Sequence, residues 1–244
     1  MKIETGINTY AFQHNPVRSD GIGVLGSLAL PLQREGEYSG RVLRDRREVG
    51  TFRIAVAHDA TSTQADVDLA DLVDEGAGEK NSCGCQGKDE GDVEGASIIK
   101  GGYLMLYASQ GPGNFQVVVD YVPRDGEGMQ VYDGHHLQRG SIFIVTLIRP
   151  GSYRMRDLAG KGEGVIEVAY PPRSEKGYVL PGPVEVKIGP EGFHPRVLNI
   201  QPTGSIVFMI ETDKALPVVE LVKPNDGPDC DRSRVTRWNN PGFK

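Results

Sequence analysis

The stretch RPGSYRMRDLAGKGEGVIEV, from Arg149 to Val168, predicts two β-strands joined by a short loop. A strand-like apolar run ends at the Pro-Gly pair, and Tyr153 follows in the first predicted strand. A glycine-rich loop comes next, and apolar and polar residues then alternate up to Val168. Pro-Gly pairs mark turns, and alternation is typical of a strand with one face on a core. The stretch therefore indicates a β-protein.

The composition of the whole chain agrees with this indication. Glycine and proline account for 32 and 16 of the 244 residues and are spread along the chain as turn residues. Five apolar or alternating runs follow one another between residues 97 and 170: SIIKGGYLMLYAS, NFQVVVDYV, SIFIVTLI, SYRM and GVIEVAY. Such spacing is typical of antiparallel sandwiches and barrels. We therefore expect an all-β fold built from two β-sandwich domains.

The N-terminal third also has strand patterns. Residues 38–59 predict a hairpin with a polar turn at Asp45–Arg47, because apolar residues alternate after that turn. Residues 63–73 keep a period of two, with Val67 facing away from Asp66. The alternative for this second segment is a short helix capped by Ser62 or Thr63.

An acidic, glycine-rich segment interrupts the strand patterns and predicts the domain organisation. Residues 66–94 hold ten acidic residues against two lysines, a local balance of about −8 within a net charge of −6. We expect an N-terminal β domain at 1–73, a loop or linker at 74–97, sandwich strands at 98–172 and 173–223, and an extended tail at 224–244. The rest of the chain has no clustered basic face, so we expect no nucleic-acid partner.

The sequence shows no recognisable secretion signal and no apolar run long enough to cross a membrane. The three cysteines do not form the pattern of a secreted disulfide framework. We therefore expect a cytoplasmic protein without a membrane span, unless a leader has been removed.

Two stretches resemble halves of a cupredoxin domain, the β-sandwich of the blue-copper proteins. Gly192–Phe208, GFHPRVLNIQPTGSIVF, resembles the first half, and Arg149–Val168 resembles the last half. Together they cover about 40 residues in reversed order, so we expect them in two different domains. The resemblance implies that at least one domain is a cupredoxin-like or immunoglobulin-like sandwich.

The same resemblance implies that the copper ligands are missing. The family's cysteine comes four residues after the aromatic that Tyr153 resembles, and this chain has Asp157 there. The loop LAGKGEG that follows contains neither His nor Met, and the family's first His falls at about Leu216 or Pro217. A type 1 copper site needs a thiolate and two imidazoles. We therefore expect no cofactor, with copper or zinc elsewhere in the chain as the alternative.

Four residues are candidates for such a metal site. Cys83 and Cys85 form a compact dithiol in the acidic segment, and His135 and His136 lie in a polar turn. Adjacent histidines on an extended segment point to opposite faces, so a solvated turn is the competing interpretation for the pair. Exposed loop cysteines without a role are the competing interpretation for the dithiol, because a lone pair supplies only half of a zinc site.

The C-terminal tail contains candidates for partner binding. It carries Arg232, Arg234 and Arg237 together with the single tryptophan, Trp238. Arginine and tryptophan are typical anchors of protein interfaces. The alternative is a tail folded back on its own domain.

These patterns predict a protein that acts by binding other protein subunits. The sequence contains no G-x-S-x-G, HExxH or P-loop motif, so we expect no enzyme. The leading hypothesis is a non-catalytic structural or accessory β-sandwich protein that binds protein subunits, itself or others, as an oligomer. One alternative is a metal-handling or electron-transfer accessory protein of the cupredoxin type. The other is a carbohydrate-binding module that uses aromatic residues: Tyr103, Tyr107, Tyr121 and Tyr132.

Overall fold

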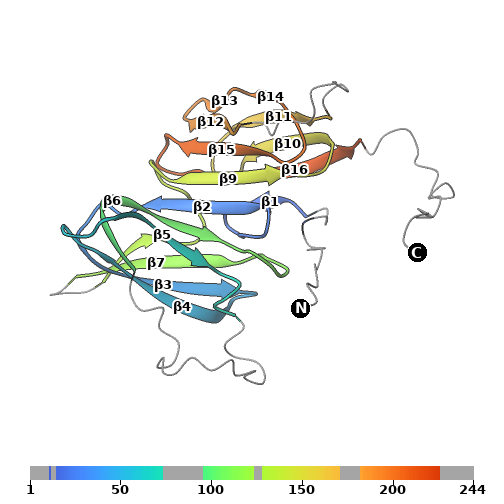
Figure 1. Cartoon of the computed structure of the whole chain (residues 1–244). Helices are drawn as coiled ribbons and strands as arrows, with labels where there is room; N and C mark the ends of the chain where they lie inside the picture. The colour runs from blue at the N-terminus through green and yellow to red at the C-terminus, as the bar shows by residue number, and fades with distance from the viewer. Residues whose placement is uncertain (1–10, 12–14, 74–95, 124–127, 171–181, 226–244) are drawn as a thin grey trace, which may run out of the picture.

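The computed structural model describes residues 11, 15–73, 96–123, 128–170 and 182–225. These residues form two β-sheets and contain no α-helix (Figure 1). One sheet has five strands, in the order β1 (Val17–Arg18), β16 (Pro217–Pro224), β10 (Gly151–Asp157), β11 (Glu163–Val168) and β14 (Val197–Ile200). The all-β fold and its sandwich-like layering, predicted from the sequence, are confirmed.

The second sheet has eleven strands and runs through the whole molecule. Its order is β13 (Gly192–His194), β12 (Val184–Gly189), β15 (Gly204–Ile210), β9 (Ile142–Leu147), β2 (Gly26–Pro31), β6 (Ala96–Tyr107), β4 (Arg47–Val56), β3 (Gly36–Arg44), β7 (Gln116–Val122) and β8 (Met129–Tyr132). The remaining strand, β5 (Ser62–Asp68), pairs with β6.

The predicted hairpin over residues 38–59 is confirmed as strands β3 and β4, which pair antiparallel. Their turn contains Asp45 and Arg46, which both have positive φ angles, 52° and 64°. Two such residues in succession suit the right-handed twist of a tight hairpin. Gly40 lies opposite Phe52, and a Cβ atom on Gly40 would overlap the Phe52 ring. This glycine is therefore required by packing.

The segment after the hairpin is a strand, so the alternative of a short capped helix is wrong. In β5 Val67 is buried and Asp66 is exposed, as the period of two predicts. Both β4 and β5 pair parallel with β6, which follows the acidic segment in the chain. Strands from before and after that segment thus share one sheet, while the proposed division into domains stays a prediction.

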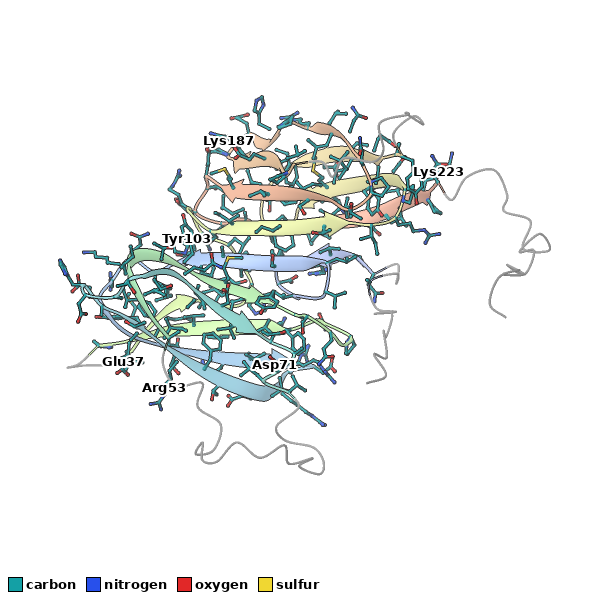
Figure 2. All side chains as sticks on the ribbon, viewed as in Figure 1. Glu37, Arg53, Asp71, Tyr103, Lys187 and Lys223 are labelled. Atoms are coloured by element: carbon teal, nitrogen blue, oxygen red, sulfur yellow. The ribbon has the colours of Figure 1, made fainter. Side chains whose placement is uncertain are left out.

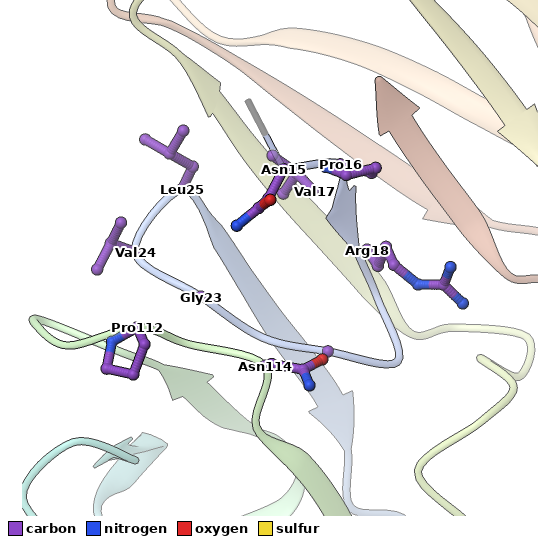
Figure 3. A pocket seen from close by; sticks show the side chains of 10 residues that line it. Asn15, Pro16, Val17, Arg18, Gly23, Val24, Leu25, Pro112 and Asn114 are labelled. Atoms are coloured by element: carbon purple, nitrogen blue, oxygen red, sulfur yellow. The ribbon is translucent and has the colours of Figure 1, made fainter. Parts of the chain in front are cut away.

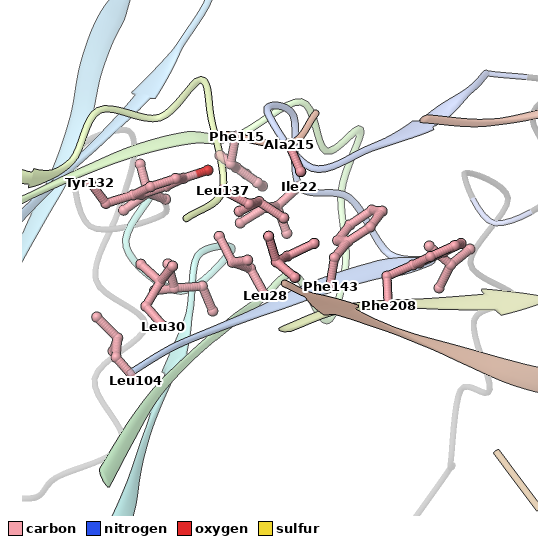
Figure 4. Packing of buried hydrophobic residues seen from close by; sticks show 14 of the residues in the cluster. Ile22, Leu28, Leu30, Leu104, Phe115, Tyr132, Leu137, Phe143, Phe208 and Ala215 are labelled. Carbon is pink, nitrogen blue, oxygen red and sulfur yellow. The ribbon is translucent and has the colours of Figure 1, made fainter. Parts of the chain in front are cut away.

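Strands β2 and β9 join the two halves of the long sheet. They pair antiparallel, and Leu28 lies opposite Phe143 in their register. Both side chains belong to one cluster of buried hydrophobic residues that extends on both sides of this join (Figure 4). A fully buried Leu or Phe side chain contributes about 1.5–3 kcal/mol to folding, so burial across the join stabilises the two halves together.

The two stretches that resemble cupredoxin halves meet in the five-stranded sheet, although β13 and β15 of the second stretch belong to the long sheet. Their assignment to two different domains stays a prediction. Strands β10 and β11 form the antiparallel pair predicted from Arg149–Val168. Strand β14, from the other stretch, pairs parallel with β11, with Val165 opposite Val197. The alternating strand patterns were compatible with several pairings, because alternation does not specify which strands become neighbours.

Aromatic side chains fill the space between the five-stranded sheet and the long sheet in the C-terminal half. Phe208 of β15 stacks on Phe143 of β9, with ring centroids 6.0 Å apart. Phe193 of β13 meets the Phe208 ring edge-on at 5.9 Å. Tyr153 and Met155 of β10 are buried in the same cluster. Such aromatic pairs add to the stability gained from burial alone.

Candidate functional site

Asp157, at the position of the family's copper-binding cysteine, is a buried structural carboxylate. It ends strand β10 and is 6% exposed. Its Oδ1 atom accepts hydrogen bonds from the backbone N–H of Leu216, at 2.8 Å, and of Ala159, at 3.1 Å. Gly160 passes so close to Oδ2 that a Cβ atom would overlap it. The carboxylate thus holds the loop after β10 in place.

The two positions that the resemblance assigned to copper ligands are in contact with each other. Besides the Asp157 bond, the backbone N–H of Leu158 donates to the carbonyl oxygen of Leu216 at 2.9 Å. This contact is made by a carboxylate and backbone groups, whereas type 1 copper needs a thiolate and two imidazoles. Among the described residues, no group of three or more His, Cys, Asp and Glu side chains could hold a metal ion.

His135 and His136 lie in a tight turn organised by Asp133. The backbone N–H groups of His135 and His136 donate to Asp133 Oδ1 at 2.8 and 3.1 Å, and Gly134 has a φ of +77°. Partial burial raises the pKa of Asp133, but these two hydrogen bonds and the neighbouring imidazoles outweigh it and hold the pKa below its ordinary value. The His136 Nδ1 atom lies 3.8 Å from Asp133 Oδ2.

The two imidazole rings are tilted by 60°, with centroids 6.4 Å apart. The turn thus places them near each other, although an extended segment would have sent them to opposite faces. The other members of the predicted metal set, Cys83 and Cys85, lie outside the described residues, so that set stays a prediction. The tail residues predicted to bind partners also lie outside them: Arg232, Arg234, Arg237 and Trp238.

The four candidate tyrosines do not form one aromatic surface. Tyr103 and Tyr107 lie on the same face of β6, as their spacing predicts, and Tyr107 is 36% exposed. Tyr121 packs against Tyr38, with ring centroids 5.3 Å apart. Tyr132 is buried, which raises the pKa of its phenol, and its hydroxyl donates to the Ser19 carbonyl oxygen at 3.4 Å. Tyr132 is therefore a residue of the core, with its hydroxyl already hydrogen-bonded.

A cavity of about 330 Å³ lies between residues 15–25 and the loop around Asn114 (Figure 3). Arg18 is the charged residue among those that line it. Its guanidinium is already bound by both Asp20 oxygens, at 2.7 and 2.8 Å. Two asparagines, Asn15 and Asn114, are the other polar side chains of the lining, and the rest is glycine or apolar. The cavity thus presents two amide side chains and no charged group that is free of a partner.

The long sheet has an apolar outer face, turned away from the buried core, that crosses the join between the halves. We call it the outer face and define it by the following residues: Ala29, Tyr103, Met105, Tyr107, Ile142, Ile144, Val207 and Met209. Figure 2 shows the side chains that project from this sheet, with Lys187 and Tyr103 labelled.

The strand register arranges this face in two rows across six neighbouring strands. One row runs Lys187, Met209, Ile142, Ala29, Met105, Asp66. The next runs Glu185, Val207, Ile144, Ser27, Tyr107, Asp68. The middle of each row is mostly apolar and the ends are charged.

The outer face was not predicted from the sequence, although a signal for it is present there. The runs SIFIVTLI and GSIVFMI are apolar at both odd and even positions, so one face of each strand remains apolar after the other is buried. Such continuous apolar runs are typical of strands covered on both sides. In the described residues the side chains on this second side, among them Ile144 and Val207, are half-buried.

Comparison of the chain with family models, curated proteins and solved structures gives no match. Within the described ranges, no helix has the length and apolar character needed to cross a bilayer.

Proposed function

We propose that this protein is a non-catalytic β-sandwich subunit that assembles with a second copy of itself through the outer face. The observation that carries this proposal is the mostly apolar, half-buried face across β15, β9, β2 and β6, in which Ser27 is polar and Ala29 is buried. An apolar patch of this kind, bordered by charged residues, is characteristic of protein interaction sites.

The outer face has the extent of the apolar centre of a small homodimer interface. Six strands about 4.8 Å apart span about 24 Å, and three rows, counting that of Tyr103, span about 14 Å along the strands, which together cover about 330 Å². A stable interface buries about 800 Å² per partner, with an apolar centre and a polar rim. The apolar rows would supply the centre, and the charged row ends would supply the rim.

One of the two rows has ends of opposite charge, as a symmetric pair of copies requires. Lys187 and Asp66 end the same row on opposite sides. A two-fold axis parallel to the strands would place Lys187 of each copy opposite Asp66 of the other, as isologous interfaces require. The same axis would place Glu185 of each copy over Asp68 of the other, a like-charge pair, and Lys187 already pairs with Glu211 at 2.8 Å, so the charge complementarity is limited to one row.

The outermost strands of both sheets favour association through a face over association through an edge. Strands β1, β8, β13 and β14 are the outermost strands, and they contain two, four, three and four residues. The longer free edge, on β5, carries Asp66 and Asp68. Short and acidic edge strands protect a sheet against pairing with another chain.

The buried Asp157 supports the non-catalytic part of the proposal. A β-sandwich that acts through its surfaces and binds no metal does not need ligand residues. Residues that stabilise the fold are expected at the ligand positions instead. Asp157 has that role, because it binds Leu216 and Ala159 through backbone groups.

Sedimentation equilibrium of the full chain and of two variants, Ile144→Lys and Met105→Lys, tests the proposal. A lysine in the middle of an apolar interface would be desolvated without a partner, so each variant is expected to weaken self-association by at least tenfold. Val165→Lys is the matched control, because Val165 is 42% exposed on the outer side of the five-stranded sheet. We expect this control to associate like the unmodified chain.

Two results would overturn the proposal. One is an unmodified chain that stays monomeric up to about 100 μM, where even a weak dimer would be visible. The other is a dimer that Ile144→Lys and Val165→Lys disturb equally, since the contact would then lie elsewhere.

A further inference from the structure

A second cleft, of about 230 Å³, lies where the N-terminal strands meet the beginning of β9. Its floor is formed by buried side chains, among them Leu30 of β2, Tyr38 of β3 and Tyr132 of β8. Its rim is exposed and comes from the loop after β2, from β8 and from the loop before β9. The cleft thus combines an apolar and aromatic floor with a polar rim, as ligand sites do.

The rim is rich in hydrogen-bond donors and has no acidic member. Two guanidinium groups, of Arg34 and Arg139, line the cleft together with three glutamine side chains: Gln33, Gln130 and Gln138. Arg139 has one loose ion pair, at 3.5 Å, with Asp213, whose side chain is 90% exposed. The charge around the cleft is therefore positive.

Arg34 is held in position without a carboxylate partner among the described residues. The Tyr38 hydroxyl accepts the backbone N–H of Arg34 at 3.1 Å and donates to its carbonyl oxygen at 2.9 Å. The guanidinium lies 5.9 Å from the centre of the Tyr121 ring, and its Nη1 atom lies 3.6 Å from the Met129 sulfur. A cation fixed in this way loses little freedom when an anion binds.

We propose that this cleft binds a small organic carboxylate. The carboxylate would accept hydrogen bonds from Arg34 and Arg139, because the planar guanidinium matches a carboxylate with two parallel donors. The apolar body of the ligand would lie on Leu30, Tyr38 and Tyr132. The volume is somewhat below the 300–1,000 Å³ typical of sites for drug-sized molecules, so the ligand is small.

NMR titration with benzoate, and with benzamide as its neutral counterpart, tests this proposal. We expect benzoate to cause saturable shifts in the backbone amides of the cleft and in the side-chain amides of Gln130 and Gln138. Charged hydrogen bonds are worth more than neutral ones, so benzamide is expected to bind at least tenfold more weakly. Arg34→Gln and Arg139→Gln are each expected to weaken benzoate binding by about tenfold.

Arg44→Gln is the matched control for the arginine variants. Arg44 lies 5.9 Å from the centre of the Phe115 ring, as Arg34 does from Tyr121, but it does not line the cleft. We expect this variant to bind benzoate like the unmodified chain. Three results would overturn the proposal: no saturable shifts with benzoate, equal affinity for benzamide, or equal affinity for inorganic phosphate, which would leave the apolar floor without a role.

Discussion

Replacement of Asp157 by alanine is expected to destabilise the protein by about 2–3 kcal/mol, because the hydrogen bonds of a buried carboxylate are lost. The larger part comes from Leu216, which is partly buried and whose N–H would lose its acceptor at 2.8 Å. A buried donor without a partner costs about 1–3 kcal/mol. Ala159 is exposed, so water can replace the bond to its N–H at smaller cost.

Chemical and thermal unfolding of the full chain measures this effect. For a chain of this size, a loss of 2–3 kcal/mol corresponds to a fall in Tm of about 4–12 °C. Asp157→Asn keeps one side-chain oxygen as acceptor, so its expected cost is about 1 kcal/mol. Asp213→Ala, at a position that is 90% exposed, is the control and is expected to stay within about 0.5 kcal/mol of the unmodified chain.

The structural role assigned to Asp157 would be refuted if Asp157→Ala were as stable as the Asp213→Ala control. The bonds to Leu216 and Ala159 would then contribute nothing that water does not replace. The loop after β10 would then have to be held by the apolar core alone.

Three further predictions concern other parts of the chain. Gly40→Ala is expected to cost about 1–3 kcal/mol in urea unfolding, because the Phe52 ring must move to admit the methyl group; an unchanged midpoint would contradict this packing. The pKa of Asp133 is depressed in the folded state, so its charge adds stability above its ordinary pKa of 3.8, and this stability is lost as the pH falls through the lower folded value. The stability difference between the unmodified chain and Asp133→Asn should therefore shrink between pH 7 and pH 2, and a difference independent of pH would exclude this contribution. Removal of residues 225–244 is expected to weaken association without unfolding the sheets, and a truncated chain that associates as well as the intact one would exclude a role of the tail.

Local features of the fold could be predicted from the sequence because short-range patterns encode them. The hairpin β3–β4 is an example, since its polar turn and the alternation up to Val56 lie within one short segment. The pair β10–β11 is another, for the same reason. In both cases the partners are neighbours in the sequence, so the turn determines which strands pair.

The long-range pairings could not be predicted in the same way. Strands β2 and β9 are more than a hundred residues apart, and neither alternation nor turn chemistry identifies one as the neighbour of the other. The parallel pairing of β11 with β14 could not be predicted from the sequence either. The reversed order of the two stretches that resemble cupredoxin halves had suggested that these strands belong to separate domains. Pairing of this kind depends on how whole faces pack, which a single strand does not encode.

For the candidate sites, too, the parts formed by neighbouring residues could be predicted and the parts formed by distant segments could not. The turn at His135 and His136 was recognised from local sequence, although the role of Asp133 in holding both backbone N–H groups was not. The outer face and the cleft around Arg34 are assembled from distant segments, so they become visible once the strand order is known.

A native mass spectrum of the full chain, isolated from its source without chelators, tests the central claim most directly. Assembly through the outer face predicts a species with the mass of two chains, and predicts that Ile144→Lys converts it to one chain while Val165→Lys does not. A single chain that carries one copper or zinc ion would contradict the proposal and would favour a metal-handling protein.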